Sequence, residues 1–76
     1  MNAQVKHEYK GPFGHYQYLN DGSLALVRDE AKQVVSKTDM QEIASEYRGV
    51  NRIYKPMALL FWTDCKNGNA KDWINQ

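Results

Sequence analysis

The sequence predicts an α+β domain: a small antiparallel β-sheet of four to five strands with one packed helix, in the approximate order β-β-β-α-β-β. Three observations predict this class. An Asp-Gly pair separates two β-prone runs, residues 38–49 have the spacing of an amphipathic helix, and Met57–Trp62 is the only stretch of six consecutive apolar residues. Because the chain has 76 residues and carries neither repeats nor linkers, we expect one small domain over residues 1–76.

The first hairpin is predicted from the turn signal Asp21-Gly22. The β-prone run His15–Leu19 precedes this signal and Leu24–Val27 follows it. An Asp-Gly pair between two such runs is a strong hairpin signal. The sequence alone does not say which face of the hairpin is buried. Residues 1–10 are polar and lack periodicity, so we expect them to be flexible.

The segment that follows carries two apolar stripes that one straight helix could not bury together. Their centres lie nine residues apart, which is about 900° at roughly 100° per residue, or half a turn out of phase. We therefore expect the chain to break near residues 36–38. The second stripe has complete helical spacing and consists of Met40, Ile43, Ala44 and Tyr47.

This predicted helix has signals at both ends. Thr38 is the expected N-cap, and Gly49 is the expected C-terminal cap residue. For residues 29–36, which precede the helix, the sequence is compatible with either a strand or a short helical turn. The β-branched pair Val34-Val35 favours a strand that is entered through a turn at Arg28–Ala31.

The end of the chain is predicted as a second hairpin. Residues 51–55 are expected to be extended, and Met57–Trp62 is expected to be a buried strand. Asn67-Gly68 would supply the turn, and Asp72–Ile74 the partner strand.

The segment Tyr54–Leu59, with Asn67-Gly68 further on, resembles the last hairpin of phage uracil-DNA glycosylase inhibitor proteins. That family is strongly acidic because its members mimic DNA, whereas this chain has a formal net charge of +1. The acidic contact strand of the family also has no counterpart in this sequence. The resemblance therefore assigns no family, and it contributes only the general idea that small proteins without a catalytic site are often inhibitors or regulators.

The charge and the cysteine content of the chain limit the classes of protein to which it can belong. Ten Lys and Arg against nine Asp and Glu is not the strong basicity of a typical nucleic-acid binder. The single cysteine, Cys65, excludes an internal disulfide, and a small domain without disulfides is typical of a reducing compartment. No apolar run approaches 18 residues and the start lacks a signal core, so we expect a cytoplasmic protein that does not span a membrane.

Residues that could perform catalysis are few and dispersed. Cys65 lies beside a predicted turn, where we expect a thiol near the surface, while His7 and His15 lie at the other end of the chain. Nucleophilic catalysis needs such groups in contact, and this spacing matches no zinc motif. We therefore predict a protein that is not an enzyme and that uses neither a metal nor a cofactor.

The main functional prediction is a small regulator or inhibitor that binds a larger protein partner of unknown identity. Tyr and Trp are frequent interface anchors, and one helix cannot cover all the large aromatic residues of this chain. The predicted partner-binding residues are Tyr54, Trp62 and Trp73. The C-terminal hairpin could also pair through its sheet edge, giving a homodimer.

The alternative prediction is a nucleic-acid-binding domain. Aromatic side chains on an open sheet face can stack unpaired bases while nearby cations contact phosphates. The candidate residues are His15, Tyr16, Tyr18, Arg48, Arg52 and Lys55. The competing interpretation is that Tyr16 and Tyr18 face the helix as core residues, because so small a domain needs its aromatic side chains inside.

Overall fold

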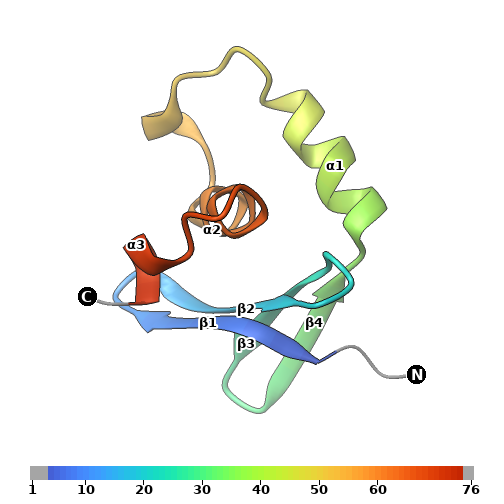
Figure 1. The fold of residues 1–76 in the computed structure, drawn as a ribbon, viewed down its shortest axis with the longest axis vertical. Coiled ribbons are helices and arrows are strands. Elements are labelled where there is room, and N and C mark those ends of the chain that lie inside the picture. Colours follow the sequence, from blue (N-terminus) through green and yellow to red (C-terminus); the bar gives the residue numbers. More distant parts are fainter. Residues whose placement is uncertain (1–3, 75–76) are drawn as a thin grey trace.

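The computed structural model describes residues 4–74. Four strands form one antiparallel sheet in sequence order: β1 (Val5–Gly11), β2 (Gly14–Leu19), β3 (Leu24–Arg28) and β4 (Ala31–Val35). They are followed by α1 (Lys37–Glu46), the short 3₁₀ turn η1 (Arg52–Tyr54), α2 (Met57–Lys66) and α3 (Lys71–Ile74). All the helices of this described part lie on one face of the sheet (Figure 1). The α+β class is confirmed, but the order of elements is not the predicted one.

Strand β1 corrects the expectation that residues 1–10 are flexible, because Val5–Gly11 forms an edge of the sheet. Tyr9 holds this strand in place. Its ring is buried, stacks on Tyr16 at a centroid distance of 5.8 Å and meets the edge of Trp73 at 5.1 Å. These are tertiary contacts, so a local pattern could not reveal them. Residues 1–3 lie outside the described residues.

The two central predictions about the sheet are confirmed. β2 and β3 pair across the Asp-Gly turn, and β3 pairs with β4 so that Arg28 faces Ala31. Asp29, in that second turn, has a φ of 51°, which Asp tolerates better than most residues. Residues 31–35 are therefore a strand, and β1 and β4 are the two edges of the sheet, whereas the C-terminal segment expected to offer a pairing edge is helical.

The predicted C-terminal hairpin is wrong: Met57–Trp62 belongs to α2, and the last segment forms α3. An apolar run without periodicity fits a helix that is buried on most sides as well as it fits a buried strand. Asn67-Gly68 ends the helix instead of turning a hairpin, and Gly68 takes a φ of +86°, as glycine often does after a helix. The likeness to the inhibitor hairpin therefore does not extend to its structure.

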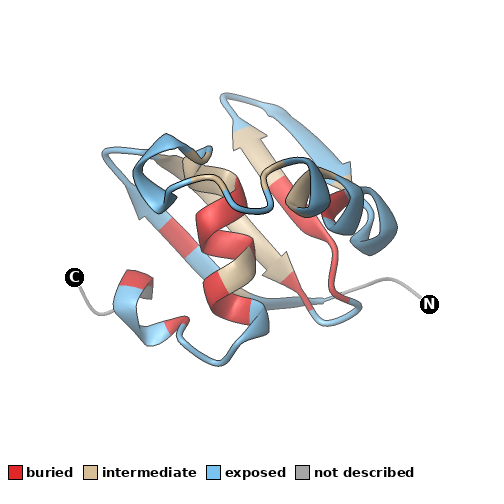
Figure 2. Cartoon of the chain, turned by 90° about the horizontal axis from the view of Figure 1, so that it is seen from above, coloured by how far each residue is buried: buried red, intermediate tan, exposed pale blue. Residues whose placement is uncertain are grey.

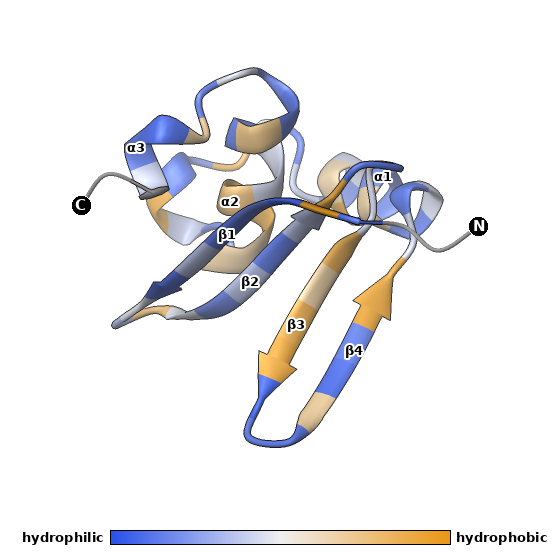
Figure 3. Ribbon diagram, turned by 60° about the horizontal axis from the view of Figure 1, so that its bottom comes forward, coloured by the Kyte–Doolittle hydropathy of each residue, from blue (hydrophilic) through white to orange (hydrophobic). Residues whose placement is uncertain are grey.

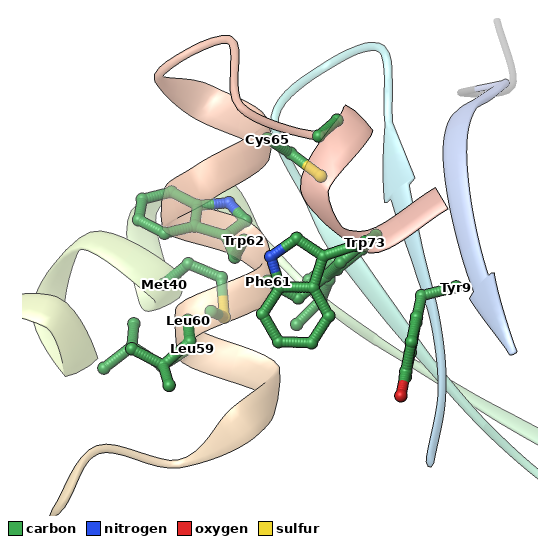
Figure 4. Close-up of a cluster of buried hydrophobic side chains, with 10 residues drawn as sticks. Tyr9, Met40, Leu59, Leu60, Phe61, Trp62, Cys65 and Trp73 are labelled. Atoms are coloured by element: carbon green, nitrogen blue, oxygen red, sulfur yellow. The ribbon is translucent and has the colours of Figure 1, made fainter. Parts of the chain in front are cut away.

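Helix α2 forms the centre of the core (Figures 2 and 4). Phe61 is fully buried and packs against Tyr9 at a centroid distance of 6.2 Å and against the edge of Trp73 at 5.5 Å. Trp62 is 1% exposed, and its indole N–H donates to the Gly22 carbonyl at 2.7 Å. This bond ties α2 to the turn between β2 and β3, so the core joins both halves of the chain.

The predicted amphipathic helix is confirmed as α1, although its N-cap is different. Ser36, and not Thr38, accepts a hydrogen bond from the Asp39 backbone N–H, at 3.2 Å. Gly49 follows the C-cap Tyr47 with a φ of +81°. Residues 51–55, expected to be extended, instead contain the η1 turn, which begins with the Asn51 side chain as its cap.

The N-cap assignment makes a direct prediction. Ser36→Ala is expected to reduce the free energy of unfolding by about 1 kcal/mol, because the Asp39 N–H loses its acceptor. Thr38→Ala is the matched control and should change it by less than about 0.5 kcal/mol, as at an ordinary exposed helix position. Urea denaturation of the two variants measures both values. A larger loss in Thr38→Ala would contradict the assignment.

Candidate functional site

The three predicted partner-binding residues lie in different environments. Trp62 and Trp73 are 1% and 8% exposed, so neither can be a surface anchor in the folded domain. This corrects the expectation that one of the tryptophans is exposed. Tyr54 is 72% exposed at the end of η1 and is available to a partner. It lies two residues before Pro56, the N-cap residue of α2.

An apolar groove, made of two hollows that share lining residues, follows the N-terminal half of α2. It is lined by Phe13, Leu26, Val35, Ile43, Pro56, Met57 and Ala58. A hollow of about 150 Å³ beside α1 shares Leu26, Pro56 and Ala58 with a neighbouring hollow of about 230 Å³. The charged residue Arg28 also lines this second hollow.

The groove exists because the helices leave part of the sheet uncovered. α2 packs over β2 and α3 packs over β1, while the turn end of the β3–β4 hairpin extends beyond the helices (Figures 1 and 3). Leu26 and Val35 point to the helix side of this hairpin but are only partly buried. The apolar floor of the groove is thus sheet surface that the domain does not cover itself.

One end of the groove is lined by Phe13, which is 57% exposed at the β1–β2 turn. Ile53 and Tyr54 of η1 are 76% and 72% exposed, but they do not line the groove. Phe13 and Met57 line both the groove and a further hollow of about 230 Å³ that Arg52 reaches. Aromatic residues, Met and Arg are the types enriched in protein interfaces.

A buried carboxylate positions η1 at this end. Asp64 of α2 accepts hydrogen bonds from the Arg52 guanidinium at 2.7 and 3.4 Å and from the Trp73 indole N–H at 2.7 Å. Burial alone would raise the pKa of Asp64, but the hydrogen bonds from Arg52 and Trp73 outweigh it and hold the pKa below its usual value. The same hydrogen bond raises the pKa of Arg52. The ion pair therefore stays formed at neutral pH.

The residues proposed for nucleic-acid binding do not form one surface. Tyr16 and Tyr18 lie under the helices, packed against the core, and burial raises the pKa of both phenols. Arg52 is paired with Asp64. Only Arg48 and Lys55 come together, in a cleft between α1 and α2.

His15, the last member of that set, points to the uncovered face of the sheet. Its Nε2 lies 2.5 Å from Glu8 Oε2, to which the Gln17 amide also donates at 2.8 Å. The hydrogen bonds from Gln17 and His15 lower the pKa of Glu8. The rings of Tyr16 and Tyr18 and the imidazole of His15 therefore lie on opposite faces of the sheet, so they cannot stack on the same bases.

Cys65 is buried in the core, which corrects the expectation of a thiol near the surface. Burial raises the pKa of the thiol to about 12, so it is protonated at neutral pH and a poor nucleophile. Within residues 4–74, no group of three His, Cys, Asp or Glu side chains is placed to hold a metal ion. None of the helices in this range has the length and apolar character to cross a bilayer.

Comparison of the chain with protein-family profiles finds no match, and comparisons with curated proteins and with solved structures find none either. The groove and its surroundings are consequently the basis for assigning a function. Tyr54 is among the residues that the sequence predicted, but the groove was not predicted. No local pattern marks the groove, because it arises from the relative positions of α1, α2 and β3.

Proposed function

We propose that this domain is a non-catalytic regulator or inhibitor that binds a larger protein, and that an apolar segment of the partner occupies the groove. The observation that carries the proposal is the exposed apolar groove itself, in which the 57% exposed Phe13 shares a hollow with Leu26 and Met57. Exposed apolar surface that is contiguous and rimmed by polar residues is characteristic of interaction sites.

The shape and chemistry of the groove indicate how such a partner would bind. The floor would accept aliphatic or aromatic side chains, because its hollow beside α1 is lined only by carbon-rich residues such as Leu24, Ile43 and Leu59. Phe13 would act as an anchor at one end of the groove, and Tyr54, which is 72% exposed two residues before Pro56, would be a further anchor outside it. Arg52 is held by Asp64 in a fixed position, so it can contribute without first being ordered.

The non-catalytic part of the proposal has separate support. The one thiol is buried on the helix side of the sheet, whereas the Glu8–His15 pair lies on the opposite face. A nucleophile and a general base must be within hydrogen-bonding reach of each other. These two groups are therefore not arranged as a catalytic pair.

A charge placed in the groove should abolish binding without unfolding the domain. Ala58 is half-buried in the groove and is the second residue of α2, where the helix dipole favours an acidic side chain. Ala58→Glu is expected to weaken partner capture at least about tenfold, because docking would bury an unpaired carboxylate. Affinity capture from nuclease-treated lysate, followed by mass spectrometry, measures the loss.

Val34→Glu is the matched control for this experiment, since Val34 is exposed on the opposite face of the sheet. It adds the same charge and should leave capture unchanged. Circular dichroism checks that both variants fold. If Ala58→Glu retained the partner, or if both variants lost it equally, the groove would not be the binding site.

A further inference from the structure

A second cleft, separate from the apolar groove, lies between the C-terminal end of α1 and the outer side of α2. It has a volume of about 390 Å³. Its lining consists of Gln41, Ala44, Ser45, Arg48, Gly49, Lys55, Trp62 and Lys66. Three of these residues are cations, and none is acidic. They come from three separate segments: the end of α1, the residue after η1 and the last turn of α2.

No carboxylate of the described residues forms an ion pair with any of the three cations. Among residues 4–74, ion pairs join only His15 with Glu8 and Arg52 with Asp64. The acidic side chains of α1 do not line the cleft. Lys66 is instead held against an aromatic ring, with its Nζ 4.9 Å from the centroid of Trp62. The cleft therefore concentrates positive charge in a chain whose formal net charge is only +1.

The helix dipoles account for part of this charge but not for all of it. Arg48 lies just beyond α1 and Lys66 in the last turn of α2, where cations offset the partial negative charge of a helix end. Two helix ends together supply about one negative charge, against three positive side chains. About two positive charges remain, which matches the charge of a phosphate group.

We propose that this cleft binds a phosphate group, with Arg48, Lys55 and Lys66 as its ligands. Arg offers two parallel N–H donors to phosphate oxygens and Lys a point charge. The cleft is not suited to hold a base, because Trp62 is 1% exposed and its ring cannot stack on a ligand. The phosphate chemistry, and not base recognition, would therefore determine binding.

The test is a titration of the ¹⁵N-labelled protein with sodium pyrophosphate at constant ionic strength, followed by NMR. Saturable shifts are expected for the amides around residues 44–49 and 62–66. Arg48→Gln and Lys55→Gln should each weaken binding about fivefold, the effect of losing one exposed charge contact. Lys10→Gln is the matched control, because it removes the same charge from the exposed strand β1 and should change nothing.

The outcomes separate a site from general attraction between charges. Equal weakening by Lys10→Gln, or shifts spread over all lysines, would overturn the proposal, as would the absence of saturable shifts. A parallel titration with a short single-stranded oligonucleotide identifies the source of the phosphate. Tighter binding that depends on Arg48 and Lys55 would indicate nucleic acid, and preference for pyrophosphate would indicate a small phosphate compound. The Ala58→Glu variant should bind pyrophosphate normally, so this site and the groove can fail independently.

Discussion

Trp62→Ala is expected to leave the protein largely unfolded at 37 °C. The side chain is 1% exposed at the centre of the core, and truncation of a buried Trp typically costs about 3–5 kcal/mol. The Gly22 carbonyl also loses the indole N–H that it accepts at 2.7 Å. A domain of this size has a free energy of unfolding of only about 4–11 kcal/mol. Urea denaturation should therefore show a midpoint that is greatly reduced or already passed without urea.

Two further variants separate the causes of this loss. Trp62→Phe keeps most of the apolar volume but removes the N–H donor to Gly22, so it should cost less than Trp62→Ala. Tyr54→Ala removes an aromatic side chain that is 72% exposed and should change stability by less than about 0.5 kcal/mol. A native midpoint for Trp62→Ala would contradict the position of this residue in the core.

The first half of the chain was predicted well because its signals are local. The Asp-Gly turn, the β-branched pair Val34-Val35 and the phase break before α1 each act over a few residues. The N-cap was misplaced by two residues, from Ser36 to Thr38, because both side chains can cap. Strand β1 was missed because Tyr9 is fixed by rings that are distant in the sequence.

The second half was predicted wrongly because burial hides periodicity. In α2, the consecutive residues Leu59–Trp62 are all buried, so no polar face marks the helix. A strand in the middle of a sheet has the same composition, and only length separates the two. Asn67-Gly68 did not resolve the ambiguity, since the same pair closes hairpins and ends helices.

The candidate site was predictable only where exposure follows from sequence. Tyr54, which lies two residues before Pro56 and was predicted as a partner-binding residue, is 72% exposed. Trp62 and Trp73 were chosen on residue type, but the fold uses both in its core. The groove arises from the relative positions of α1, α2 and β3, which no local pattern contains. The cleft proposed to bind phosphate likewise depends on the fold, which places Lys55 and Arg48 in the lining of the same hollow.

Asp64→Ala is the second substitution with a large expected effect. The carboxylate is buried and accepts hydrogen bonds from Arg52 and from the Trp73 indole. Hydrogen bonds to a charged group contribute about 1.5–3 kcal/mol, and a buried donor left without an acceptor adds to the loss. We expect Asp64→Ala to reduce the free energy of unfolding by about 3 kcal/mol. Arg52→Ala should cost less, because its side chain is 58% exposed and Trp73 keeps its acceptor.

Acid titration tests the same interaction through its charge. The pKa of Asp64 is lowered in the folded protein, so the unfolded chain takes up the proton first as the pH falls. The stabilisation is complete above the ordinary carboxyl pKa of about 3.9 and is lost below it, as the pH falls through the folded-state value. The pKa values of Glu8 and Asp21 are also lowered in the folded protein, so their contributions to its stability are lost in the same acid range. The wild type should therefore lose more stability between neutral pH and pH 3 than Asp64→Asn, in which this carboxyl is absent. Equal acid sensitivity of the two proteins would show that the charge of Asp64 does not hold η1 against α2.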